Sequence, residues 1–205
     1  SQMLRSLVGS EMCIRDSSMA KAWGDSRTYK FMHLPIQSGS QKILDSMLRD
    51  HTLEDFWEVV ETFRQYYPEM MIITDIITGF PGETDEDHQK TVDLLNRLLP
   101  DLVNLTRFSP RQGTPAARYK RVNSNTVKAR SKELTELRKK LGAKSFKRFV
   151  GRKTSVLAVE NQRQGSTLCR DDNYRPIIIK EELPLGEFYD VEIIDSDYAF
   201  LTAVL

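Results

Sequence analysis

The sequence has little cysteine, no long apolar run and almost no net charge. Two cysteines among 205 residues, Cys13 and Cys169, cannot build a disulfide framework, and alone they cannot hold a zinc ion or an iron–sulfur cluster. No apolar stretch approaches the roughly 20 residues that a membrane-spanning helix needs, so we expect no membrane as a partner. No charged start followed by an apolar stretch indicates a signal peptide, and a reducing cytoplasm is the expected compartment.

The net charge of +1 hides an uneven distribution. Residues 51–101 carry three Lys or Arg against twelve Asp or Glu, whereas residues 118–153 carry fourteen basic residues against two acidic ones. A basic stretch of this density attracts polyanions whatever the net charge of the chain. The alternative is an ordinary solvated helix face, which the scarcity of acidic residues disfavours.

Apolar periodicity predicts alternating strands and helices in the first two thirds of the chain. Thr52 and Thr84 are each followed three residues later by an aspartate, a pattern that caps helices. Strand–helix units repeated at this spacing predict a parallel sheet or barrel, of which three strands form only a part. The expected elements are strands at 29–37, 70–80 and 102–108, helices at 41–49 and after each of the two threonine caps, and a long basic helix at about 124–148.

After Gly151 the pattern changes to short runs of period two with turns between them. Such runs predict a small β-barrel of the oligonucleotide-binding kind, with the boundary between the two parts near 149–151. The expected strands are 154–160, 175–180, 187–194 and 199–205.

Residues 1–17 fit neither pattern. The codons for 12–16 can be written as the end of a sequencing adapter, so we expect 1–17 to be a non-native tail joined to a truncated gene. Cys13 then has no function. A disordered native tail is the alternative.

Polar turns follow the three expected strands, where βα barrels place their ligands. They are 37–40, 79–83 and 109–114, and none has the glycine pattern of a phosphate-binding loop. Asp75 interrupts an apolar strand, so it either pairs with a neighbour such as Arg107 or faces the barrel lumen.

The histidines and carboxylates show no catalytic pattern. We expect His33 to be a hydrogen-bonded imidazole rather than a metal ligand, and His51 and His88 to face solvent. No nucleophile–base pair and no paired catalytic carboxylates are recognisable, so we expect neither a catalytic residue nor a metal ligand in this chain. The chain is then a binding module, or its chemistry belongs to a cofactor.

Four segments in order resemble one family, the radical S-adenosylmethionine (radical SAM) methylthiotransferases that modify tRNA. They are HLPIQSGS (33–40), DIITGFPGET (75–84), FSPRQGTPAA (108–117) and the β-rich end with Arg170, Tyr174 and Pro176. VNLTRFSPRQGTPAA and GEFYDVEIID are most similar to the archaeal and eukaryotic branch, which acts on N6-threonylcarbamoyladenosine at position 37. The branches that act on isopentenyladenosine 37 and on ribosomal protein S12 are the alternatives, and a non-catalytic RNA-binding module is the alternative of another class.

The resemblance implies an α/β chain that holds the C-terminal part of a radical SAM βα barrel at 18–149 and a TRAM RNA-binding barrel at 150–205. It implies S-adenosylmethionine and two [4Fe–4S] clusters, whose cysteine ligands are absent from this sequence, so we expect this chain to be inactive alone. In the intact enzyme, a methylthio group would be added at C2 of the target adenine. The implied partners are the tRNA anticodon arm, an electron donor and a sulfur source, and the expected state is a monomer.

The resemblance and the basic stretch also predict site residues. Leu48 departs from the family, which usually has asparagine at this position. Tyr174 is expected to contact RNA, and the alternative for it is a place in the barrel core. The residues expected near the cofactor are Gln37, Ser38, Gly39, Asp75, Gly79, Glu83 and Pro110. The residues expected to contact RNA are Lys139, Lys140, Lys147, Arg148, Arg152, Lys153, Arg170 and Tyr174.

Overall fold

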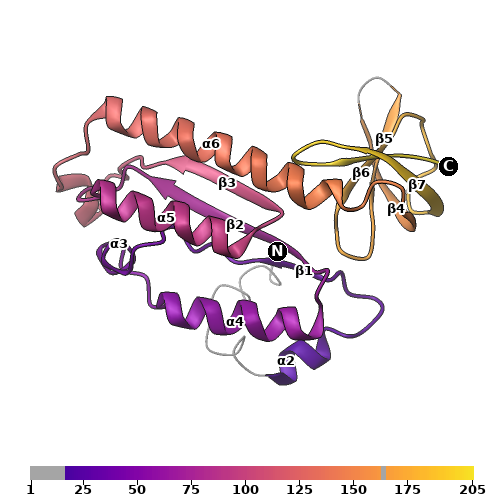
Figure 1. Ribbon diagram of the computed structural model, residues 1–205, viewed down its shortest axis with the longest axis horizontal. Helices are drawn as coiled ribbons and strands as arrows, with labels where there is room; N and C mark the ends of the chain where they lie inside the picture. Colours follow the sequence, from indigo (N-terminus) through magenta and orange to yellow (C-terminus); the bar gives the residue numbers. More distant parts are fainter. Residues whose placement is uncertain (1–16, 163–164) are drawn as a thin grey trace.

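The computed structural model describes residues 17–162 and 165–205, which form a helix-covered sheet and a small barrel (Figure 1). The expectation for the first sixteen residues therefore lies outside the described part. The sheet half consists of α2 (Ser17–Ala22), β1 (Phe31–His33), α3 (Gln41–Ser46), α4 (Leu53–Tyr66), β2 (Met71–Thr78), α5 (Asp85–Leu98), β3 (Leu102–Arg107), the 3-10 helix η1 (Pro115–Arg118) and α6 (Ser124–Lys147). The barrel half consists of β4 (Lys153–Gln162), β5 (Ser166–Arg170), β6 (Pro176–Ile179), β7 (Phe188–Ser196) and β8 (Leu201–Val204).

The three strands of the sheet are parallel and lie in the order β1-β2-β3, as the repeated strand–helix units predicted. The first strand is much shorter than expected, because it ends at His33. Pro35 has no N–H to donate to a ladder, so pairing stops before it. It resumes only as a single bridge, in which the Gln37 N–H donates to the Asp75 carbonyl at 2.8 Å.

Both predicted helix caps are confirmed. The Thr52 side chain accepts the backbone N–H of Asp55, and the Asp55 side chain accepts the N–H of Thr52. Thr84 and Asp87 make the same reciprocal pair at the start of α5. Two backbone donors that a helix N-terminus leaves without partners are satisfied in each case.

The helices cover one face of the sheet. Ile72 and Ile76 of β2 are buried on that face in a cluster with residues of α4, α5 and α6. Ile73, Asp75 and Ile77 alternate with them and are only half-buried on the opposite face. A nearly continuous apolar run is typical of a strand buried on both faces, but among the residues described no helix covers this second face of β2.

Helix α6 connects the two halves (Figure 1). Phe146 near its end is fully buried in the core of the barrel, in one apolar cluster with Phe149 and with Met71 of β2. Gly142 is needed for this docking, because a Cβ there would lie 2.1 Å from the carbonyl oxygen of Tyr198. The helix backbone and the turn before β8 are therefore in direct contact.

The barrel is closed in the order β4-β5-β6-β8-β7, which confirms a small all-β barrel. The period-two pattern missed one strand, β5. Cys169 points inward from β5 and is fully buried, and burial raises the pKa of its thiol. In the residues described, no helix is long and apolar enough to cross a membrane.

Candidate functional site

The turn after β1 is held tightly against α5. The Gly39 N–H donates to Thr91 Oγ1 at 2.9 Å, and a Cβ at Gly39 would lie 2.3 Å from the carbonyl oxygen of Lys90. Ser38 is buried, and Gln37 takes a positive φ of 71° to make the turn. Ser38 and Gly39 therefore hold the loop in place.

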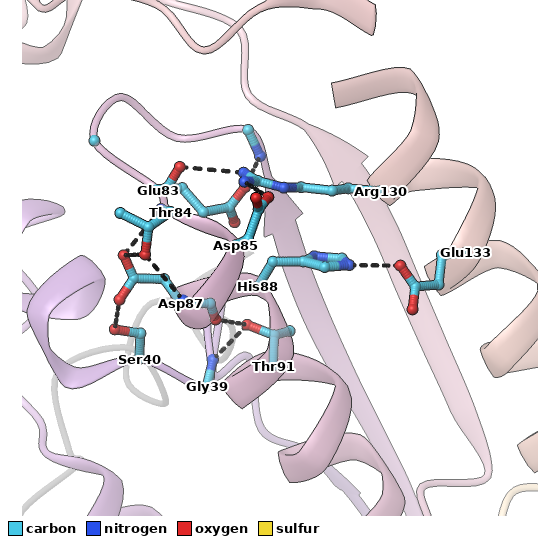
Figure 2. Close-up of polar contacts among 12 residues, drawn as sticks. Gly39, Ser40, Glu83, Thr84, Asp85, Asp87, His88, Thr91, Arg130 and Glu133 are labelled. Atoms are coloured by element: carbon cyan, nitrogen blue, oxygen red, sulfur yellow. Dashed lines mark hydrogen bonds and ion pairs between the residues drawn. The ribbon is translucent and has the colours of Figure 1, made fainter. Parts of the chain in front are cut away.

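Asp87 links this turn to the N-terminus of α5 (Figure 2). Its carboxylate accepts Ser40 Oγ at 2.7 Å, Lys42 Nζ at 2.7 Å, and the N–H and Oγ1 of Thr84 at 3.0 and 2.8 Å. Burial alone would raise the pKa of Asp87, but the hydrogen bonds from Lys42, Thr84 and Ser40 outweigh it and hold this pKa well below its usual value. The carboxylate is thus charged, and both of its oxygens accept hydrogen bonds that hold the turn after β1 against the start of α5.

A second buried pair joins the loop after β2 to α6 (Figure 2). Glu83 Oε2 accepts the Gly79 N–H at 2.9 Å and Arg130 Nη1 at 2.6 Å, and Arg130 Nη2 donates to Asp85 Oδ1 at 2.7 Å. The Glu83 and Arg130 side chains are only 3% and 7% exposed. Gly79 has a φ of 80°, and a Cβ there would meet Val127 of α6 at 2.6 Å. Glu83 and Gly79 therefore fix this loop to α6.

His88 is buried, so the expectation that it faces solvent is wrong. Its Nε2 lies 2.9 Å from Glu133 Oε2 on α6 (Figure 2). His51, by contrast, is half-buried.

Asp75 lies on the open face of the sheet in a polar row that crosses all three strands. Its Oδ1 is 2.8 Å from His33 Nε2 and accepts Asn104 Nδ2 at 2.9 Å. The register places Asn104 beside Asp75, and Arg107 three residues further on beside Thr78, so Arg107 is not the partner of Asp75. Among the described residues, no group of three or more His, Cys, Asp or Glu could hold a metal ion.

A cavity of about 470 Å³ lies beyond the ends of β2 and β3. Phe80 and Phe108 line it, with their rings edge to face and their centroids 5.0 Å apart. None of the seven residues expected near the cofactor lines this cavity. The turns after β2 and β3, which were predicted as ligand loops, lie beside this cavity, but the sequence did not single out the residues that line it.

The predicted RNA-binding residues fall into two groups. Lys139 and Lys140 lie on the outer part of α6, Lys147 is exposed at its end, and Lys153 is exposed at the start of β4. Several of the others make contacts within the protein. Arg148 lies 3.6 Å from Asp101, Arg152 pairs with Glu69 at 2.9 Å, and Arg170 stacks on the Tyr174 ring at 4.2 Å.

Tyr174 is half-buried between the two halves of the molecule. Its ring centroid lies 5.0 Å from that of Tyr29 and 4.9 Å from that of Phe31. Arg175 beside it is buried, pairs with Asp171 at 2.8 Å and donates to the Glu69 carbonyl. Tyr174 thus lies at the contact between barrel and sheet rather than in the barrel core, and its expected contact with RNA stays a prediction.

Residues 14–95 match the Radical SAM superfamily. The fold also resembles that of a solved structure described as "Coproporphyrinogen III oxidase (HemN) from Escherichia coli is a Radical SAM enzyme", with a TM-score of 0.50 at 15% identity over 62% of this chain and 30% of that chain. This part of the chain is thus similar in sequence to the Radical SAM superfamily, and the fold is similar to that of the solved structure. The matched range overlaps the end of the expected tail 1–17.

Relatives of higher sequence identity carry a more specific name. The chain is 43% identical over 187 residues to a probable threonylcarbamoyladenosine tRNA methylthiotransferase of Archaeoglobus fulgidus, which covers 91% of this chain and 44% of that protein. The chain is 39% identical to the protein of the same name from Pyrococcus horikoshii, over 88% of this chain and 42% of that protein. It is 33% identical to the threonylcarbamoyladenosine tRNA methylthiotransferase of Mus musculus, over 89% of this chain and 32% of that protein. The chain is a homologue of these methylthiotransferases, as its motifs indicated, and it spans less than half of their length.

Proposed function

We propose that this chain is part of an enzyme that adds a methylthio group to C2 of N6-threonylcarbamoyladenosine 37 in tRNA. The observation that carries the proposal is 43% identity to a relative of that name across 91% of the chain. Residues 18–149 are then the later part of the radical SAM barrel, and 150–205 the TRAM domain.

The described residues do not fit an iron–sulfur cluster. Their one cysteine, Cys169, is buried inside the small barrel, and no metal-holding group surrounds it. The clusters that the family implies therefore need ligands from elsewhere, and we derive no step through them. S-adenosylmethionine would supply the radical that removes hydrogen from the adenine.

The residues expected near S-adenosylmethionine divide into two roles. Asp75 lies on the open face with His33 and Asn104, where the three could bind the hydroxyl or amino groups of a nucleoside. Gln37, beyond the end of β1, and Pro110, beyond the end of β3, complete the group that we propose to lie nearest the cofactor. Ser38, Gly39, Gly79 and Glu83 position the loops through the contacts described above.

We propose that the exposed lysines of α6 contact the phosphates of the anticodon arm. Lys140 and Lys147 are exposed and have no ion-pair partner among the residues described, so their charge is available to an external anion. Phosphate neutralisation releases counterions and makes RNA binding sensitive to salt. Arg148, Arg152, Arg170 and Tyr174 would support this surface by joining the barrel to the sheet.

We expect the variant Lys140→Gln/Lys147→Gln to bind an anticodon stem–loop about tenfold more weakly than the unmodified chain. The slope of log affinity against log salt should fall by about one for each lost phosphate contact. Filter binding across a salt series measures both quantities. The charge-matched control Lys21→Gln/Lys90→Gln should leave the slope unchanged. Equal losses of RNA affinity in the two double variants would contradict the proposal that α6 contacts the RNA.

The proposed reaction is tested on the complete protein encoded at the locus of this chain. We expect the purified, cluster-loaded protein to convert tRNA that carries N6-threonylcarbamoyladenosine into its 2-methylthio form, as read by mass spectrometry of the digested nucleosides. Transfer to isopentenyladenosine or to ribosomal protein S12 instead would establish one of the alternative branches. RNA binding without transfer to any of the three would establish the non-catalytic module.

A further inference from the structure

The cavity beyond β2 and β3 is lined by three arginines and no acidic residue. Arg49 follows α3, Arg107 ends β3, and Arg111 lies in the loop after β3. The complete lining is Ser46, Met47, Leu48, Arg49, Ile77, Phe80, Thr106, Arg107, Phe108, Ser109, Arg111, Thr114, Pro115, Ala116 and Tyr119. A volume of about 470 Å³ lies within the range of roughly 300–1,000 Å³ that is usual for small-molecule sites.

Among the residues described, these three arginines, like Arg118 and Arg121, lack the side-chain partners that the other arginines of the sheet half have. Arg130 and Arg97 each pair with a carboxylate, and Arg64 donates to the carbonyl of Leu98. No side-chain hydrogen bond, ion pair or ring contact joins Arg49, Arg107 or Arg111 to any residue in the described part of the chain. Three like charges around one cavity repel one another until an anion enters, so the cavity favours an anionic ligand.

The other lining residues form apolar and aromatic walls. Phe80 is buried and packs edge to face against the half-buried Phe108, and Tyr119 is 48% exposed nearby. Leu48 is 78% exposed although it is a large apolar residue, and its φ of 57° is in the left-handed region that leucine disfavours. A strained and exposed apolar residue at the edge of a cavity indicates a contact with a ligand rather than a contribution to the core.

We propose that this cavity receives the modified adenine, with the carboxylate of its threonylcarbamoyl group bound by Arg107 together with Arg49 and Arg111. This inference rests on the proposed function and names the residues that would select its substrate. The planar base would lie against Phe80, Phe108 and Leu48, because aromatic walls suit a nucleobase. Guanidinium groups bind carboxylates by paired, charge-assisted hydrogen bonds.

The same residues disfavour the apolar alternative. An isopentenyl group has no charge, so it would cover the arginines without giving them hydrogen-bond acceptors. The three arginines are exposed in the free chain, so a substrate that covers them without offering acceptors would remove their hydration at a cost, and such a cost is a common source of discrimination between substrates. The cavity thus selects the threonylcarbamoyl branch over the isopentenyl branch.

The test compares binding of the 205-residue chain to three anticodon stem–loops that differ only at position 37. They carry adenosine, N6-threonylcarbamoyladenosine, or the methyl ester of the latter, which is neutral but similar in shape. We expect the carboxylate form to bind about tenfold more tightly than the other two, and Arg107→Gln to abolish this preference. Arg118→Gln is the matched control, because Arg118 is exposed on η1 and does not line the cavity.

Three results would overturn the inference. The first is equal binding of the three RNAs. The second is a preference for the carboxylate form that survives the triple variant Arg49→Gln/Arg107→Gln/Arg111→Gln. The third is equal weakening of the binding of all three RNAs by Arg107→Gln, which would mean that Arg107 contacts backbone phosphates. Circular dichroism of each variant checks that it is folded. Salt-dependent binding of the unmodified stem–loop tests the proposed function separately. A result that contradicts the cavity proposal would therefore leave the finding on RNA binding unchanged.

Discussion

Replacing Arg130 with methionine is expected to lower the free energy of unfolding by about 3–5 kcal/mol. Arg130 is the partner of Glu83 at 2.6 Å, and both side chains are buried between α6 and the loop after β2. Methionine keeps much of the packing volume but leaves the carboxylate without its cation. An unpaired buried charge costs more than the net value of the pair, which explains the size of the effect. Urea denaturation at neutral pH measures it.

Two further variants show whether the effect belongs to the pair. Arg130→Met/Glu83→Gln should recover part of the loss, because the neutral amide keeps an oxygen for the Gly79 N–H and removes the unpaired charge. Lys132→Met, at an exposed position on the same helix, should change stability by no more than about 0.5 kcal/mol. A loss in Arg130→Met as small as that in Lys132→Met would contradict the role assigned to the pair.

Replacing Asp87 with asparagine is expected to cost about 2–3 kcal/mol at neutral pH. The amide nitrogen of asparagine would face donors on Ser40, Lys42 or Thr84, where the carboxylate accepts from all three. Asp93→Asn on the same helix is the control, because Asp93 is exposed and accepts one hydrogen bond, from Gln89. A similar loss in the two variants would mean that the Asp87 contacts add nothing beyond an ordinary surface bond.

The effect of Asp87 also has a defined pH dependence. Its pKa is lowered in the folded protein, so its contribution is fully present above the unfolded value of about 3.9 and is lost as the pH falls below it. The difference between Asp87→Asn and the unmodified chain should therefore be constant from about pH 7 to pH 5 and narrow below about pH 4. Urea denaturation at a series of acidic pH values measures this difference.

Local patterns predicted the helices and the parallel sheet well. Thr52 with Asp55 and Thr84 with Asp87 are encoded within four residues of sequence, and both capping boxes are present. The strand β5 was missed because its five residues follow Gly165 without a distinctive apolar run, and its pairing with β4 and β6 comes from distant parts of the chain. Short strands of this kind depend on their neighbours rather than on their own propensity.

The site was less predictable because its contacts are non-local. The burial of His88 depends on α6, whose Glu133 lies 45 residues further along the chain. The partner of Asp75 depends on strand register, and register brings Asn104 rather than Arg107 beside it. The loops after the strands were predicted as a ligand region, but the cluster of unpaired arginines there appears only once α3, β3 and the following loop are brought together.

The contact between Gly142 and Tyr198 has a consequence for insertions and deletions. Helix α6 has 24 residues, or about 36 Å, and its two ends are fixed by Arg130 in the sheet half and by Phe146 in the barrel. One inserted residue between them would turn the barrel by about 100° about the helix axis and move it by about 1.5 Å, which would separate Gly142 from the turn that it fits. The length of α6 is therefore constrained by the contacts at both of its ends, whatever residues its exposed face carries.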